Sequence, residues 1–363
     1  MTTNPLPAAP TPPSAPTGPR ATAPTGPPAT GPTGPPATGP AGRPPSAGPA
    51  SAVTRPGPAR RALRALAVVS CVPYVSLKIA WMSGSRVGIP EGSALLDDPD
   101  LMAAVNLVTV LMDAAVVVLA LLFTQRWGRA VKAWLLAFPM WGATGLLAPI
   151  MVAYPAQMAA GHTASTEPFL DEWVFTVVYS GFILQGLALG TLFALYARDR
   201  WGGVWQGRVR DVSPALFRPA VRVVAVAASV LLLVPAALHG LWLSGSARGL
   251  SAGRIAERGS DFFVLEGVRL LFAAAAIVGV LMMVLRLGRW LPLKAPLALA
   301  WVGTAGIGCW GGWLLLTALV PQSDPANEPT AAMLLAYAGE MITGMLLGAC
   351  VAVLLRRRAE RPA

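Results

Sequence analysis

Long apolar stretches dominate the chain after residue 58, and short polar segments separate them. Eight of the stretches reach about 20 residues, the helical length that crosses a hydrocarbon layer about 30 Å thick. They do not alternate with a period of two, and a helix satisfies its own backbone hydrogen bonds in lipid. The pattern therefore predicts an all-α, polytopic membrane helix bundle with eight transmembrane helices. The spans are placed at Ala62–Met82, Leu101–Thr124, Ala133–Tyr154, Trp173–Tyr196, Val221–Leu243, Phe262–Leu285, Ala295–Val320 and Ala331–Leu355.

The composition fits a lipid environment. Of the 363 residues, 55% are hydrophobic and 12% are charged, whereas soluble domains are about one-quarter charged. The formal charge of +11 is spread between the apolar runs instead of along one face, so we expect no nucleic-acid partner. The lipid bilayer is the expected partner, together with a membrane or cytoplasmic protein.

Charge also orients the predicted bundle. Most of the 28 Lys and Arg residues fall in the N-terminal tail, in the loops at 126–132, 198–222 and 286–294, and at the C-terminal end. The other loops hold most of the acidic residues. By the positive-inside rule, this predicts a multi-pass protein of the plasma membrane with both termini cytoplasmic.

Residues 1–58 have a composition of their own, rich in Pro, Ala, Gly and Thr and free of acidic residues. The phrase PTGPPATG occurs twice there, at 24–31 and 32–39. Too few apolar side chains are present to offset the entropy of ordering, so this segment is predicted to be a disordered cytoplasmic tail. The alternative is an arm that docks on a proline-recognition partner.

A repeated phrase divides the rest of the chain. WMSGSRVG at 81–88 returns as WLSGSARG at 242–249, and YSGFILQGLALG at 179–190 returns as YAGEMITGMLLG at 337–348. Pro, Trp and Gly positions between them recur at nearly one shift. The sequence thus predicts two tandem four-helix membrane repeats that insert in parallel. The predicted domains are 59–200 and 221–358, with a cytoplasmic linker at 201–220 and a C-terminal tail at 359–363.

The repeated phrase predicts local structure as well. Trp81 and Trp242 lie at interface depth, and the Ser-Gly-Ser that follows favours the end of a helix. Pro73 and Pro235 remove one helical hydrogen bond each and predict kinks. An outward-facing vestibule built from both copies is the alternative. Small-xxx-small pairs predict close helix packing of spans four and eight against partners or each other, at Gly186, Gly190, Gly344 and Gly348.

Ionisable residues inside the spans are the candidate sites, because each is costly in lipid. Asp113 and Glu340 lie near the middle of their spans, and the two repeats do not share them. Asn106 and Thr109 continue a polar stripe with Asp113. Such carboxylates indicate either an ion pathway or a structural bond to a buried cation, and both interpretations stay open here.

Four further ionisable residues lie closer to the span ends. Lys78 occupies the position of His239 in the repeat, and we expect its side chain to snorkel toward the membrane surface. Glu266 and Arg269 are three residues apart, so we expect them to form an ion pair on one helix.

Catalytic signatures are missing from the sequence. Two histidines and three isolated cysteines do not form a metal or haem motif, and no Walker A or HExxH motif occurs. We therefore predict no catalytic, metal-binding or cofactor-binding residues.

The stretch VPYVSLKIAWMSGSRVGI, at Val72–Ile89, resembles uncharacterised multi-pass integral membrane proteins of high-GC actinobacteria. The resemblance implies a membrane bundle and no activity. Three functions remain open. A non-catalytic membrane subunit or regulator is favoured, a transporter or permease-like protein moving a small solute or ion is the alternative, and an intramembrane enzyme is the third.

Overall fold

A computed structural model describes residues 57–91, 93, 96, 99–161, 170–320 and 324–360. These ranges fold into α-helices and short 3₁₀ helices, and they hold no β-strand. The predictions for the N-terminal tail before residue 57 and for the last three residues lie outside the described residues.

Eight helical segments are long and apolar enough to cross a membrane, which confirms the predicted helix bundle. Several helices are longer than the predicted spans, because polar residues at their ends are helical as well. The spans are α1–α2 (Pro58–Val69, Val72–Met82), α3 (Pro99–Thr124), α4 (Ala133–Ala159), α5 (Glu172–Trp201), α6 (Pro219–Leu243), α8 (Ser260–Val284), α9 (Lys294–Ala318) and α10 (Ala331–Ala359). The short helices are η2 (Arg126–Arg129), η3 (Gly202–Trp205), η4 (Val209–Asp211), η5 (Pro214–Leu216), α7 (Ala252–Ala256) and η6 (Pro325–Asn327).

The first span is broken where a kink is predicted. Helix α1 ends at Val69 and α2 begins at Val72, directly before Pro73. Because Pro73 has no N–H, the carbonyl of Val69 cannot receive its helical hydrogen bond. Pro235, at the matching position, lies inside the uninterrupted helix α6. The two prolines therefore have different local effects.

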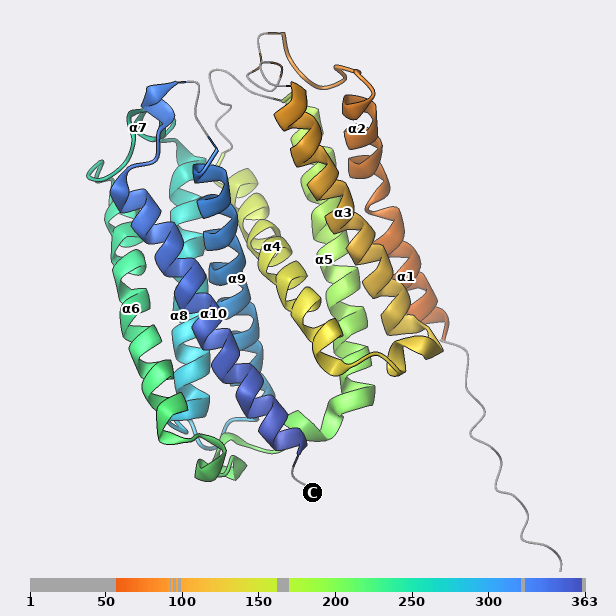
Figure 1. The fold of residues 1–363 in the computed structure, drawn as a ribbon, viewed down its shortest axis with the longest axis vertical. Helices are drawn as coiled ribbons and strands as arrows, with labels where there is room; N and C mark the ends of the chain where they lie inside the picture. Colours follow the sequence, from red (N-terminus) through yellow and green to blue (C-terminus); the bar gives the residue numbers. More distant parts are fainter. Residues whose placement is uncertain are drawn as a thin grey trace, which may run out of the picture. The chain divides into compact units, whose positions relative to one another are not determined.

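The second half forms a closed four-helix bundle. Helices α6, α8, α9 and α10 each pack against the next, and α10 returns to α6 (Figure 1). Its core includes Leu232, Phe272, Val280, Ile307 and Leu347. The first half is more open, since α1 packs on α3 and α5, and α4 packs on α5, but α3 and α4 barely touch. Helix α4 instead leans on α8 and α9 of the second half.

The two halves meet at the crossing of α4 and α9 through a reciprocal pair of hydrogen bonds. The indole N–H of Trp141 donates to Thr304 Oγ1 at 3.2 Å, and that of Trp301 donates to Thr144 Oγ1 at 3.2 Å. Both pairs are related by the same sequence shift. Gly145 allows the contact, because a Cβ there would lie 2.2 Å from the carbonyl oxygen of Ala305.

The glycine pairs of α5 and α10 do not face each other. A Cβ on Gly186 would meet Met151 of α4, and a Cβ on Gly344 would meet the backbone of Gly308 in α9. Gly348 faces Trp141 of α4, whereas Gly190 has open space around it. Helices α5 and α10 do not pack along each other, because their small faces are turned to α4 and α9.

Both copies of the repeated phrase fold into the same turn. In each, the indole N–H of the leading tryptophan donates to the backbone carbonyl six residues later, at 2.7 Å in the first and 3.0 Å in the second. Gly84 and Gly245 adopt φ angles of 88° and 91°, which favour glycine. Trp81 and Trp242 are buried and hold the turns closed, which differs from the expected anchor at the lipid interface.

Each turn then fixes the start of the last helix in its half. The carbonyl oxygen of Gly88 accepts from the backbone N–H of Asp171, which precedes α5, at 3.0 Å. The carbonyl oxygen of Gly249 accepts from the hydroxyl of Thr330, the N-cap residue of α10, at 2.5 Å. The repeated phrase is therefore a packing element of the fold.

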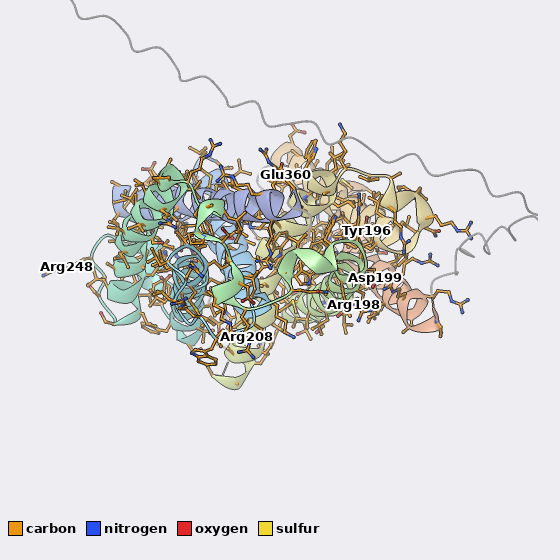
Figure 2. The ribbon with its side chains drawn as sticks, turned by 90° about the horizontal axis from the view of Figure 1, so that it is seen from below. Tyr196, Arg198, Asp199, Arg208, Arg248 and Glu360 are labelled. Atoms are coloured by element: carbon orange, nitrogen blue, oxygen red, sulfur yellow. The ribbon has the colours of Figure 1, made fainter. Side chains whose placement is uncertain are left out.

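The linker at 201–220 is folded against one end of the second bundle. Its residues Val209, Val212 and Leu216 are buried, and backbone hydrogen bonds join Val209 to Leu291 and Leu293 to Gly207, both at 3.0 Å. Figure 2 views this end of the molecule, where the charged end of α5 also lies. The linker is thus part of the bundle's end.

We predict that Gly145→Ala lowers stability by about 1–3 kcal/mol, because the added methyl group would overlap the backbone of α9. The measurement is thermal unfolding of the purified chain in detergent. Gly142→Ala, on the same helix with open space at its Cβ position, is the matched control and should leave the melting temperature unchanged or raise it. Equal melting temperatures for the two variants would contradict this packing.

Candidate functional site

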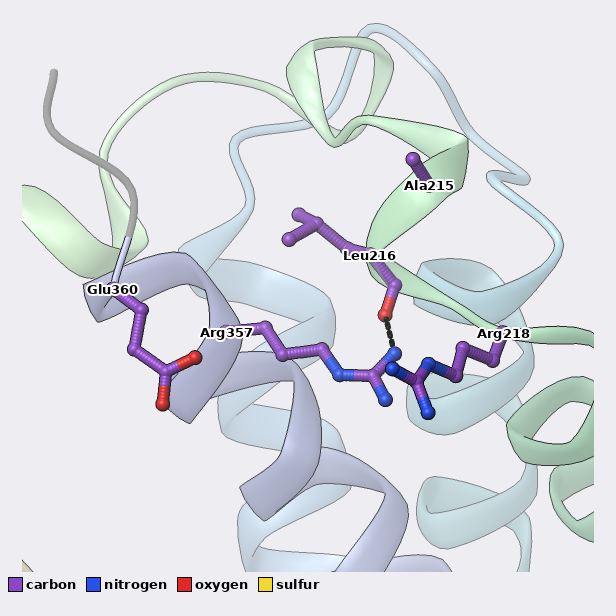
Figure 3. A pocket seen from close by; sticks show the side chains of 5 residues that line it. All are labelled: Ala215, Leu216, Arg218, Arg357 and Glu360. Carbon is purple, nitrogen blue, oxygen red and sulfur yellow. Dashed lines mark hydrogen bonds between the residues drawn. The ribbon is translucent and has the colours of Figure 1, made fainter.

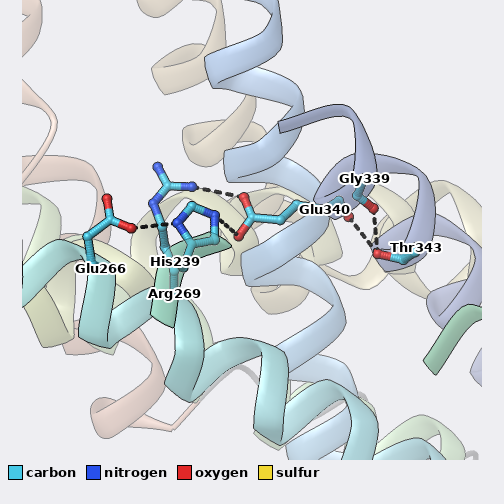
Figure 4. Close-up of polar contacts among 6 residues, drawn as sticks. All are labelled: His239, Glu266, Arg269, Gly339, Glu340 and Thr343. Carbon is cyan, nitrogen blue, oxygen red and sulfur yellow. Dashed lines mark hydrogen bonds and ion pairs between the residues drawn. The ribbon is translucent and has the colours of Figure 1, made fainter. Parts of the chain in front are cut away.

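Four charged or titratable side chains from three helices meet inside the second bundle (Figure 4). His239 comes from α6, Glu266 and Arg269 from α8, and Glu340 from α10. His239 Nδ1 lies 2.5 Å from Glu266 Oε2, and its Nε2 lies 3.1 Å from Glu340 Oε1. Arg269 donates to Glu340 Oε2 at 2.8 Å. We call these four residues the buried ionic cluster.

Burial makes the charge balance of this cluster important. The side chains of His239 and Glu340 are 1% and 2% exposed. A neutral imidazole can donate from only one ring nitrogen, yet both nitrogens of His239 face carboxylate oxygens. A doubly protonated ring would donate from Nδ1 to Glu266 and place its charge beside Glu340, and its charge with that of Arg269 would cancel the two carboxylates. This state removes the net charge from a region that lipid surrounds.

Neighbouring residues hold the cluster in place. Gly311 brings α9 against α10, because a Cβ there would lie 2.7 Å from Cβ of Glu340. Trp242 packs edge-on against the ring of His239, with 5.1 Å between the ring centroids. Thr343 bonds back to the carbonyl of Gly339 at 2.6 Å, so its hydroxyl is satisfied within α10. The carboxylate is therefore held between its two cationic partners.

The pairing differs from the sequence expectation. Glu266 and Arg269 do not form an ion pair with each other. Glu266 contacts His239 on α6, whereas Arg269 reaches Glu340 on α10. One turn of α8 thus faces two neighbouring helices, and each side chain finds its counter-charge across the bundle. For Glu340, the contacts match the interpretation as a structural bond.

The first half holds a polar stripe, which is formed by Lys78, Asn106, Thr109, Asp113 and Gln185. Lys78 Nζ donates to Asn106 Oδ1 at 2.9 Å and lies 4.8 Å from the ring centroids of both Tyr74 and Trp81. The ammonium group therefore points to α3 and two aromatic faces. The expectation that Lys78 snorkels to the surface is wrong, because these partners lie within reach inside the bundle.

Asp113 belongs to the same stripe and lies two helical turns beyond Asn106 on α3. Its Oδ1 accepts from Gln185 Nε2 at 3.0 Å, and the same amide nitrogen lies 3.4 Å from the sulfur of Cys71. Thr109 bonds to its own helix, with its hydroxyl 2.9 Å from the carbonyl oxygen of Asn106. Sequence reasoning missed Gln185, although a single amide inside an apolar run was the available signal.

Three buried polar atoms of this stripe have no hydrogen-bond partner. They are Asn106 Nδ2, Asp113 Oδ2 and Gln185 Oε1. Buried polar groups are nearly always satisfied, so such atoms indicate a place for water or an ion. In contrast to Glu340, Asp113 has no cation within ion-pair distance among the described residues. The structure does not bring Asp113 and Glu340 together, since α3 and α10 do not pack on each other.

Comparison with models of protein families, with curated proteins and with solved structures found no match. Among the described residues, no group of His, Cys, Asp and Glu is arranged to hold a metal ion.

We predict that Glu340→Gln lowers the free energy of unfolding by about 3 kcal/mol, because it leaves the partly buried Arg269 without a counter-charge. Replacing both residues, as Glu340→Met with Arg269→Met, should recover part of this loss. Thermal unfolding in detergent measures both effects.

The matched control for this network is Arg254→Gln. Arg254 pairs with Glu257 at 3.7 Å on the surface, so its loss should change stability by less than about 1 kcal/mol. A Glu340→Gln variant as stable as this control would show that the cluster contributes little to stability.

Proposed function

We propose that the protein is a non-catalytic membrane subunit or regulator. In this proposal the second bundle is a rigid scaffold, and the open first half meets a partner protein within the membrane. The observation that carries it is the engagement of Glu340, because both of its carboxylate oxygens are occupied by His239 and Arg269. A carboxylate that carried ions would need an oxygen free for its cargo.

The unequal packing of the two halves supports a partner on the first half. Helix α8 is covered by α6, α9 and α4, whereas its counterpart α3 lacks a close neighbour on the side of α4. Among the described side chains, α8 exposes two large apolar residues, Leu271 and Val278. Helix α3 exposes Val105, Leu107, Val108, Leu111, Met112 and Val118. Because an apolar face fits lipid as well as a helix, the weak contact between α3 and α4 is the feature that favours another helix here.

We also propose that the two halves arose by tandem duplication and lie parallel in the plasma membrane with both termini cytoplasmic. The matching turns and the reciprocal tryptophan bonds support the duplication. Basic residues of the linker, of the α8–α9 loop and of the end of α10 gather at one end, which supports the orientation.

A photo-crosslinking residue at Leu111 tests the partner. We expect it to attach to a single protein at a ratio near one to one in native membranes, because Leu111 lies on the exposed face of α3 and is 60% exposed. The measurement is intact-mass analysis of the purified crosslinked species. The matched control is Leu271 of α8, which is 55% exposed and should attach to lipid alone. A monomer without crosslinks at either position would argue against a subunit.

A transporter or permease-like role is the second candidate, and the unpartnered atoms around Asp113 favour it. Asp113 Oδ2 and Gln185 Oε1 are acceptors without donors, and Asn106 Nδ2 is a donor without an acceptor. Together they could hold water or a small cation in the first half. The second half has alanine at the position that matches Asp113, so such a site would occur once.

For this second role, we predict that Asp113→Asn abolishes proton uptake into proteoliposomes under an imposed potassium potential, because the variant lacks the titrating carboxylate. A pH-sensitive dye inside the vesicles provides the measurement. Asp199→Asn changes a carboxylate at the helix end that pairs with Arg60, and its flux should equal that of the unchanged chain. Equal flux in the Asp113 variant would exclude Asp113 from a pathway.

A further inference from the structure

A shallow depression lies at the end of the second bundle, between the start of α6 and the end of α10. Ala215, Leu216, Arg218, Arg357 and Glu360 line it. The guanidinium groups of Arg218 and Arg357 extend into it from opposite sides (Figure 3). Arg357 is held there by a hydrogen bond to the carbonyl oxygen of Leu216, at 2.7 Å.

The positive charge in this depression is not balanced by the described residues. Neither Arg218 nor Arg357 has a carboxylate within ion-pair distance. Glu360 lines the same depression, but its carboxylate pairs with Arg356 at 3.3 Å. Two cations that share a space repel each other unless an anion lies between them, and guanidinium groups suit the oxygens of phosphate.

A third arginine continues the positive surface toward the membrane. Arg222 lies one turn beyond Arg218 on α6, and its side chain donates to the carbonyl oxygen of Pro214 at 3.3 Å. Its Nε is buried and has no hydrogen-bond partner. This Nε lies inside the protein, out of reach of a ligand in the depression, so Arg222 contributes its positive charge to the surface.

An apolar groove begins at the same arginine. Arg222, Val223, Val226 and Ala227 line it along one face of α6, one turn deeper into the span. A ligand with a phosphate group and a hydrocarbon chain would fit both parts. Its phosphate would contact the arginines, and its chain would lie over the valines.

We propose that this surface binds one anionic phospholipid. The phosphate lies between Arg218 and Arg357 with Arg222 beside it, and an acyl chain follows the groove of α6. Basic pockets between transmembrane helices bind anionic headgroups in this way. The site joins α6, α10 and the linker, so a bound lipid would tie the linker to both helices. It is independent of the proposed partner on α3.

The test is native mass spectrometry of the full chain in detergent with added phosphatidylglycerol. We expect one retained lipid per chain, and a loss of affinity of about tenfold in Arg218→Gln, since a charge-assisted contact is removed. Arg218 makes no hydrogen bond within the described structure through its side chain, so this variant should fold normally. Arg289→Gln is the matched control, because Arg289 is an exposed arginine of the α8–α9 loop at the same end of the bundle and lies outside the depression.

Further arms separate a phospholipid from a free anion. Phosphatidylcholine with the same acyl chains should be retained far less, and inorganic phosphate should not displace phosphatidylglycerol at equal concentration. Val226→Ser should weaken lipid binding through the groove alone. Equal retention of lipid in the unchanged chain and Arg218→Gln would overturn the proposal, and so would phosphate that binds as tightly as the lipid.

Discussion

The close approach of α9 to its neighbours is the contact on which the rest of the bundle depends. Glycines remove side chains where the helix crosses others, so a Cβ on Gly303 would lie 2.3 Å from the backbone of Ala276 in α8, and one on Gly311 would lie 2.7 Å from α10. The same helix meets α4 at Gly145 and thereby joins the two halves. In lipid, where apolar burial does not drive helices together, such tight packing supplies much of the association.

That packing makes the buried ionic cluster possible. Side chains of His239, Glu266 and Glu340 are long enough to meet only because α8 and α10 are drawn toward α9, and α6 packs on both of them. Once formed, the cluster selects one rotational orientation of the helices, whereas packing alone would allow several. Each charge finds its counter-charge on another helix, so rotation of a helix would leave an uncompensated charge in the membrane. Within the part of the first half that the structure describes, no equivalent set occurs, and the helices there are more loosely packed.

Sequence periodicity predicted the eight spans and the repeated turns, because hydropathy over about 20 residues and a glycine-containing phrase are local properties. It also identified the ionisable residues that the structure places inside the bundle. It could not predict their partners. Glu266 and Arg269 share a helix face, yet neighbouring helices offered each a better counter-charge. Lys78 found an amide and two rings that no single-helix argument reveals. Gln185 was missed because its role depends on α3.

The break in the first span has an electrostatic consequence. Helix α2 starts at Val72, so its positive dipole end lies within the span instead of at the surface. Cys71, at that end, lies 3.4 Å from the Gln185 amide that binds Asp113. The negative end of α1, at Val69, lies beside this positive end and offsets much of that partial charge, so the break acts on Asp113 only at short range. An unbroken helix would place neither partial charge in the middle of the span.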